Sequence, residues 1–201
     1  KDVQESAKQK AVEHLSKPAS RGCVIELPCG FGKTVTALVI AAAMGRRTLI
    51  LVHKSFLVEQ WMERVKQFIP DATIGIVQQN KVQVDADIVI GMIQSIAKRE
   101  YPADTFEHFG LLVVDEAHHI AAPFLNSSLR KLPIQKVLGL TATPDRADGL
   151  THLMHYCLGQ TIFRADRDKH ACIRGSNADE SANASSSPPP ALTVLSLNYA
   201  S

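Results

Sequence analysis

The chain has 201 residues, of which 45% are hydrophobic and 21% charged, and 22 basic against 20 acidic side chains leave a formal net charge of +2. This length supports a buried core without disulfides or metals, and the small charge excludes a nucleic-acid binder that relies on a global basic field. The four cysteines form no C-x-x-C pair, and neither a signal peptide nor an apolar stretch of transmembrane length is found, so we expect an intracellular, soluble protein.

Strand-like and helix-like runs alternate from about residue 22 to residue 163, after an amphipathic helix over Gln4–Leu15. The expected strands are apolar throughout, which is typical of strands buried on both faces of a mostly parallel sheet. These strands are Cys23–Leu27, Thr48–Val52, Ile74–Val77, Asp87–Gly91, Leu111–Val114 and Val137–Leu140. Helices are expected over Lys33–Met44 and from Ser55 onward, where Leu57, Trp61, Val65 and Phe68 share one face. The pattern predicts an α/β sandwich with helices flanking the sheet.

The composition changes after residue 165. Residues 175–190 are rich in Ser, Asn, Ala and Pro, so we predict that residues 166–190 form a flexible linker or insertion. Residues 191–201 regain a strand-like pattern, which indicates either an added strand or the start of a second lobe.

A glycine-containing loop, Leu27-Pro28-Cys29-Gly30-Phe31-Gly32-Lys33-Thr34, follows the first expected strand and opens a helix. Its glycines allow a close backbone approach, and its N–H groups would point at a β-phosphate. Lys33 would contact the β- and γ-phosphates, and the Thr34 hydroxyl would complete a magnesium shell. Leu27 replaces the first glycine of the usual pattern, so a plain glycine-rich turn is the alternative.

Two carboxylates, Asp115 and Glu116, follow the buried strand Leu111–Val114. Ligands bind at the carboxyl ends of strands in open parallel sheets. Asp115 would hold magnesium, and Glu116 would polarise the water that attacks the γ-phosphate. The alternative is that these charges only end a strand, which the phosphate loop about eighty residues earlier argues against. His118 and His119 suggest no metal site, because no third ligand accompanies them.

Together these motifs resemble the first motor lobe of a superfamily 2 helicase or translocase. Gly30–Thr34 resembles motif I, Asp115-Glu116-Ala117-His118 resembles motif II in its DEAH spelling, and Thr141-Ala142-Thr143 resembles motif III. The wider strings around them are similar to the XPB-like branch and its viral relatives. The resemblance implies a RecA-like P-loop sandwich, a helicase ATP-binding lobe over residues 1–165, and ATP and Mg²⁺ as cofactors.

The resemblance also implies which residues bind each ligand. The nucleotide would be contacted by Gln4, Pro28, Cys29, Gly30, Phe31, Gly32, Lys33 and Thr34. Gln4 stands where the family often has a glutamine that reads adenine, with Gln9 as the alternative; an amide can pair with both an amino group and a ring nitrogen. Thr141, Ala142 and Thr143 would couple the γ-phosphate site to the strand site, with a plain turn as the alternative.

Two further segments match motifs that contact nucleic acid in this family. Their residues are His53, Lys54, Ser55, Gln60, Gly91, Gln94 and Ser95. A lysine and small hydroxyls at strand-to-helix turns suit phosphate oxygens. An ordinary helix cap is the alternative for Lys54 and Ser55, and for Trp61 we favour core packing over a nucleic-acid contact.

No Q-x-x-G-R-x-G-R motif is found, and in these motors a second lobe supplies that arginine finger. We therefore expect the N-terminal lobe of a longer nucleic-acid-dependent ATPase, a DNA helicase or duplex translocase, with DNA preferred and RNA left open. Alone it would be a poor ATPase. The alternatives are a non-catalytic nucleic-acid-binding module regulated by ATP, which Glu116 argues against, and a P-loop kinase, in which Thr141-Ala142-Thr143 would have no role.

Overall fold

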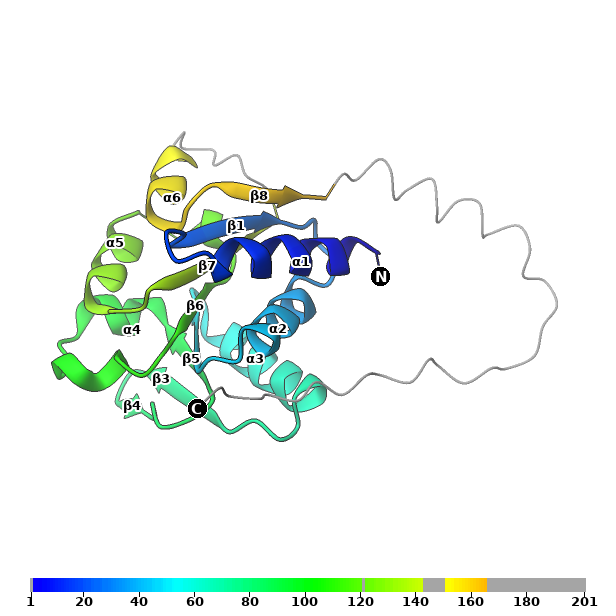
Figure 1. Cartoon of the computed structure of the whole chain (residues 1–201). Helices are drawn as coiled ribbons and strands as arrows, with labels where there is room; N and C mark the ends of the chain where they lie inside the picture. The colour runs from blue at the N-terminus through cyan, green and yellow to red at the C-terminus, as the bar shows by residue number, and fades with distance from the viewer. Residues whose placement is uncertain (1, 121, 143–150, 166–201) are drawn as a thin grey trace.

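The computed structural model describes residues 2–120, 122–142 and 151–165. Within these ranges, helices cover both faces of an eight-stranded sheet (Figure 1). The helices are α1 (Asp2–Ser16), α2 (Lys33–Met44), α3 (Ser55–Phe68), α4 (Ile93–Lys98), α5 (Ala122–Lys131) and α6 (Thr151–Leu158), with short 3₁₀ segments η1 (Ala103–Phe106) and η2 (Ala117–His119). The strands are β1 (Gly22–Glu26), β2 (Thr48–Val52), β3 (Ile74–Gln78), β4 (Lys81–Val82), β5 (Ile88–Met92), β6 (Leu111–Val114), β7 (Lys136–Thr141) and β8 (Thr161–Arg164).

The strand order across the sheet is β4-β3-β5-β2-β6-β7-β1-β8. Neighbouring strands run parallel except β3 and β4, which are antiparallel. Glu26 is in register with Thr141, and Leu51 with Val114, so the carboxyl ends of β1, β7, β2 and β6 meet at one edge. The predicted α/β sandwich with a mostly parallel sheet is confirmed.

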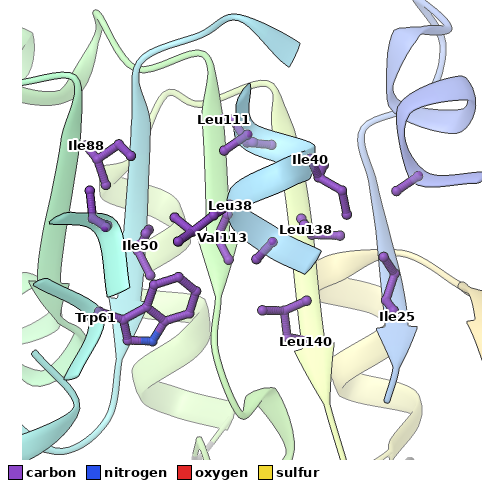
Figure 2. Packing of buried hydrophobic residues seen from close by; sticks show 14 of the residues in the cluster. Ile25, Leu38, Ile40, Ile50, Trp61, Ile88, Leu111, Val113, Leu138 and Leu140 are labelled. Carbon is purple, nitrogen blue, oxygen red and sulfur yellow. The ribbon is translucent and has the colours of Figure 1, made fainter. Parts of the chain in front are cut away.

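Two apolar clusters lie on opposite faces of the sheet. One cluster packs α1, α2 and α3 against it, and the other packs α4, α5 and α6. Successive residues of a strand enter opposite clusters, as Leu49, Ile50 and Leu51 of β2 do. Figure 2 shows side chains of the first cluster, including Leu38 of α2 and Trp61 of α3 around the central strands. The strands are thus buried on both faces, as their apolar composition predicted.

The predicted face of α3 is partly buried. Trp61 and Val65 are buried, whereas Leu57 and Phe68 are half-buried. None of the helices in the described ranges combines the length and apolar composition needed to cross a bilayer. The predicted linker at residues 166–190 and the predicted segment at residues 191–201 lie outside the described residues.

Candidate nucleotide and nucleic-acid sites

The loop between β1 and α2 has the backbone conformation that its glycines allow. Gly30 has φ of +85° and Gly32 has φ of +76°, in the left-handed region that favours glycine. Gly32 is the N-cap of α2, and a glycine offers no side-chain acceptor to the first turn. The N–H groups at this helix terminus are therefore available to an anion such as a phosphate.

The residues predicted to act on phosphate meet at the end of β6. Lys33 Nζ donates a hydrogen bond to Glu116 Oε1 over 2.6 Å, with both side chains mostly buried. Thr34 and Asp115 line the same cavity of about 360 Å³. Glu116 has φ of +46°, an uncommon conformation for a residue other than glycine. The structure thus joins the phosphate loop and the acidic pair in one site.

Burial shapes the electrostatics of this site. Burial raises the pKa of the Asp115 carboxyl, the hydrogen bond from Trp61 lowers it, and the nearby Glu116 carboxylate raises it again. Burial also lowers the pKa of His118, as does the neighbouring His119. The neutral form of His118 is therefore favoured near neutral pH.

The donor set fits a magnesium ion that arrives with a nucleotide. Asp115 and Thr34 supply hard oxygen atoms, and Glu116 Oε2 is buried, makes no hydrogen bond and lies 3.4 Å from His118 Nδ1. In the part of the chain that the structure describes, no group of three or more His, Cys, Asp or Glu side chains is arranged to hold a metal alone. Mg²⁺ typically binds through one or two carboxylates plus substrate phosphates, and this donor set provides the protein's share of such a shell.

Gln4 of α1 reaches the phosphate loop. Its Nε2 donates to the Phe31 carbonyl oxygen over 3.1 Å. A Cβ added at Gly32 would lie 2.1 Å from the same nitrogen, so the amide rests directly on the loop. Gln9 is exposed on the same helix. Of the two glutamines, Gln4 is therefore the one that contacts the loop.

Of the remaining loop residues, Pro28 is buried, Cys29 and Gly30 are exposed, and Phe31 packs against the first cluster.

The predicted coupling motif contacts the acidic motif. Thr141 Oγ1 is hydrogen-bonded to His118 Nδ1 over 2.8 Å, and Thr141 is fully buried at the end of β7. Ala142 follows and is half-buried, while Thr143 lies outside the described residues. A side-chain hydrogen bond thus joins η2, which follows the acidic pair, to the end of β7.

Most of the predicted nucleic-acid residues gather after two neighbouring strands, β2 and β5. Lys54 and Ser55 are exposed at the start of α3. Gln94 Nε2 donates to the His53 carbonyl oxygen over 2.9 Å, which ties the loop after β2 to α4. Ser95 Oγ accepts a hydrogen bond from the Gln79 backbone N–H over 3.1 Å. Lys54 and Ser55 are thus exposed, whereas Gln94 and Ser95 are half-buried. We refer to Lys54, Ser55, Gln94 and Ser95 together as the polar surface around Lys54.

Two predicted nucleic-acid contacts are placed differently. Gly91 is buried inside β5, where a Cβ would lie 3.0 Å from Ile96 Cδ1, so its lack of a side chain serves packing. Gln60 lines the cavity of Lys33 and Thr34, one and a half turns along α3 from its exposed start. Neither residue belongs with the polar surface around Lys54.

Trp61 is a core residue, as we favoured, but it is also part of the site. Its Nε1 donates to Asp115 Oδ2 over 2.8 Å. Helical spacing in the sequence placed Trp61 on an apolar face. It could not indicate the hydrogen bond to Asp115, which lies 54 positions away in the chain.

A mostly parallel sheet with a glycine-containing loop after β1 and an acidic pair after β6 is the arrangement of a RecA-like P-loop domain. A family model described as "Type III restriction enzyme, res subunit" (ResIII) matches residues 1–146. The chain belongs to the ResIII family.

Similar proteins support the same class. The "Putative ATP-dependent RNA helicase L396" of Acanthamoeba polyphaga mimivirus is 35% identical over 152 residues, which are 76% of this chain and 29% of that protein. The fold is similar to the UvsW helicase from bacteriophage T4, with a TM-score of 0.64 and 20% identity over 80% of this chain and 58% of that chain. It is also similar to the Type ISP restriction-modification enzyme LlaGI, solved in complex with a DNA substrate mimic, with a TM-score of 0.65 and 21% identity over 90% of this chain and 21% of that chain. The chain thus spans less than two thirds of each of them.

Proposed function

We propose that the chain is the ATP-binding motor lobe of a nucleic-acid-dependent ATPase, a DNA helicase or duplex translocase whose second lobe is supplied by a longer protein. The observation that carries this proposal is the convergence of Lys33, Asp115 and Glu116 beside the phosphate loop. The ATP-dependent helicase name of the mimivirus relative supports the choice of nucleotide.

The phosphate loop and several polar residues around it have roles in this proposal. The first-turn N–H groups of α2 and the Lys33 ammonium bind phosphate oxygens and neutralise their charge. Thr34 and Asp115 hold Mg²⁺, which supplies charge neutralisation at the transferring phosphoryl group. Gln4 lies beside the loop and would read the adenine edge by its amide.

Glu116 would orient the attacking water and accept its proton. Without nucleotide, one of its oxygen atoms is occupied by Lys33. Because a triphosphate offers Lys33 a more highly charged partner, its binding would release that oxygen. Until ATP is bound, the ion pair would therefore keep this Glu116 oxygen from acting on water.

The polar surface around Lys54, Ser55, Gln94 and Ser95 would contact the backbone of a nucleic-acid strand. LlaGI, a structural neighbour of this chain, was solved with a DNA substrate mimic, which supports DNA. The mimivirus relative is named an RNA helicase, so RNA must also be tested as the nucleic-acid ligand. We also propose that the chain is related to the XPB-like branch, and this relation is supported by the motif sequences alone.

Phosphate release by the longer protein, measured with and without nucleic acid, tests this proposal. We expect duplex DNA to stimulate ATP hydrolysis. The rates with single-stranded DNA and with RNA are measured for comparison. Nucleotide binding without any hydrolysis would instead indicate the regulated binding module. Hydrolysis or phosphoryl transfer that no nucleic acid changes would indicate a kinase-like enzyme.

A further inference from the structure

Trp61 makes a polar contact that core packing does not require. The indole is 2% exposed and belongs to the first apolar cluster, where Figure 2 shows it. Its Nε1–H nevertheless donates to Asp115 Oδ2 over 2.8 Å. Asp115 is itself only 6% exposed, so the bond lies in a region of low dielectric, where hydrogen bonds are strong.

The other oxygen of this carboxylate is also held. Asp115 Oδ1 accepts the backbone N–H of Glu116 over 2.9 Å. Two donors from different elements, α3 and the turn after β6, thus fix the plane of one carboxylate. A carboxylate has about four acceptor positions, so each oxygen keeps a lone pair for a cation.

The chemistry of the indole suits this task. An indole N–H only donates and carries no acceptor, so it can hold the Asp115 carboxylate without competing with it for a cation.

We propose that Trp61 is a positioning residue that holds the Asp115 carboxylate in the orientation in which it binds the divalent cation of the nucleotide. This inference rests on the proposed function, because it assumes a cation at Asp115. Partners that orient a metal ligand in this way typically contribute about 10–100-fold in metal affinity.

The first test uses Mn²⁺ with ADP and follows free Mn²⁺ by electron paramagnetic resonance. Trp61→Phe keeps an aromatic ring in the cluster and removes the N–H. We expect it to weaken Mn²⁺ binding in the presence of ADP by about 10–100-fold, while cation-free ADP binding stays unchanged. Val65→Ala, also buried on α3, is the control for loss of packing and should keep the wild-type Mn²⁺ affinity.

The second test needs no change at Trp61. The chain has one tryptophan, so its indole N–H gives a single resonance in a ¹H–¹⁵N spectrum. We expect Mg²⁺ with ADP to shift this resonance and Mn²⁺ with ADP to broaden it. Asp115→Asn should shift it without any cation and abolish both responses.

The outcomes separate this inference from the proposed function. Wild-type Mn²⁺ affinity in a folded Trp61→Phe variant, or an unchanged indole resonance while Mn²⁺ is bound, would overturn the role of Trp61 and leave the proposed function intact. No Mn²⁺ binding by the wild-type chain with ADP would refute both.

Discussion

Lys33 and Glu116 are 83 positions apart in the chain, and their side chains form an ion pair with 2.6 Å between Nζ and Oε1. Lys33 opens α2 directly after the phosphate loop, and Glu116 follows the buried strand β6. The pair shows that the two motifs face one cavity. In the proposed function the two residues have different roles, because Lys33 would bind the phosphates and Glu116 would act on water.

Lys33→Ala and Glu116→Gln should therefore separate binding from turnover. Lys33→Ala removes the cation nearest the phosphates, and we expect nucleotide binding to be lost. Glu116→Gln keeps the shape of the side chain but not its basicity, so binding is retained and hydrolysis falls by about 10²–10⁴-fold. Titration with a fluorescent ATP analogue and phosphate-release assays measure the two effects. Wild-type ATP affinity in Lys33→Ala would contradict the site assignment.

Asp115→Asn should stabilise the fold at neutral pH. The raised pKa of the buried carboxyl means that the folded state favours the protonated form more than the unfolded state does. Asp115 therefore contributes stability below about pH 4, and that contribution is lost as the pH rises through the raised pKa. An amide avoids this loss, and each unit of pKa shift is worth about 1.4 kcal/mol.

Urea unfolding of both chains at pH 4 and pH 7 measures this difference. The free energy of unfolding of the variant should match that of the wild type at the lower pH and exceed it at the higher pH. If the wild-type chain is the more stable of the two at pH 7, the stabilisation of the charged Asp115 carboxylate by its contacts exceeds the cost of burying it. In either case the variant should lose Mg²⁺-dependent nucleotide binding.

Gln4→Ala should reduce the preference for adenine nucleotides. The Gln4 amide contacts the phosphate loop, and in the proposed function it would also form hydrogen bonds to the base, worth about 0.5–1.5 kcal/mol each. Loss of one such bond should lower ADP affinity by about two- to tenfold, and GDP affinity should change little. Gln9→Ala, an exposed change on the same helix, is the matched control. Equal losses for ADP and GDP would assign Gln4 to loop structure rather than to base recognition.

Lys54→Ala should weaken nucleic-acid binding without regard to sequence. The exposed ammonium at the start of α3 would neutralise one phosphate, so its loss should lower the slope of log K against log salt by about one. Lys66→Ala, exposed in the last turn of the same helix, should leave the slope unchanged. Fluorescence anisotropy with labelled duplex DNA and with RNA, at several salt concentrations, measures both variants.

The local motifs predicted the fold and the convergence of Lys33 with the acidic pair. The glycine-containing loop follows β1 and Asp115 follows β6, and a parallel sheet brings the ends of such strands to one edge. The bond between Trp61 and Asp115 could not be predicted, because helical spacing gives a face but not its partner. Strands β4 and β8 were missed for a related reason: they are short edge strands, exposed or half-exposed, so they lack the apolar run of a buried strand.

Glu26 is a second feature that the sequence did not reveal. It ends the apolar strand β1, yet its carboxylate is 2% exposed. It accepts hydrogen bonds from Thr161 Oγ1 over 2.7 Å and from the Arg164 guanidinium, whose Nη2 lies 3.3 Å away. These contacts fasten the edge strand β8 to the strand that leads into the phosphate loop.

Arg164→Ala should destabilise the fold by about 1–3 kcal/mol. The Arg164 side chain is 65% exposed, so solvent screens the Coulomb attraction. The cost arises because Glu26 is left buried with a weaker set of donors. A second change, Glu26→Gln, removes that buried charge and should recover part of the loss.

Lys17→Ala breaks an exposed ion pair with Glu13 and should cost no more than about 0.5 kcal/mol, which makes it the control. Urea unfolding of the single and double variants gives the coupling energy between Glu26 and Arg164. Removing a main donor from a buried carboxylate should destabilise the fold. A loss of stability in Arg164→Ala no larger than that in Lys17→Ala would therefore show that the guanidinium does not hold the edge strand.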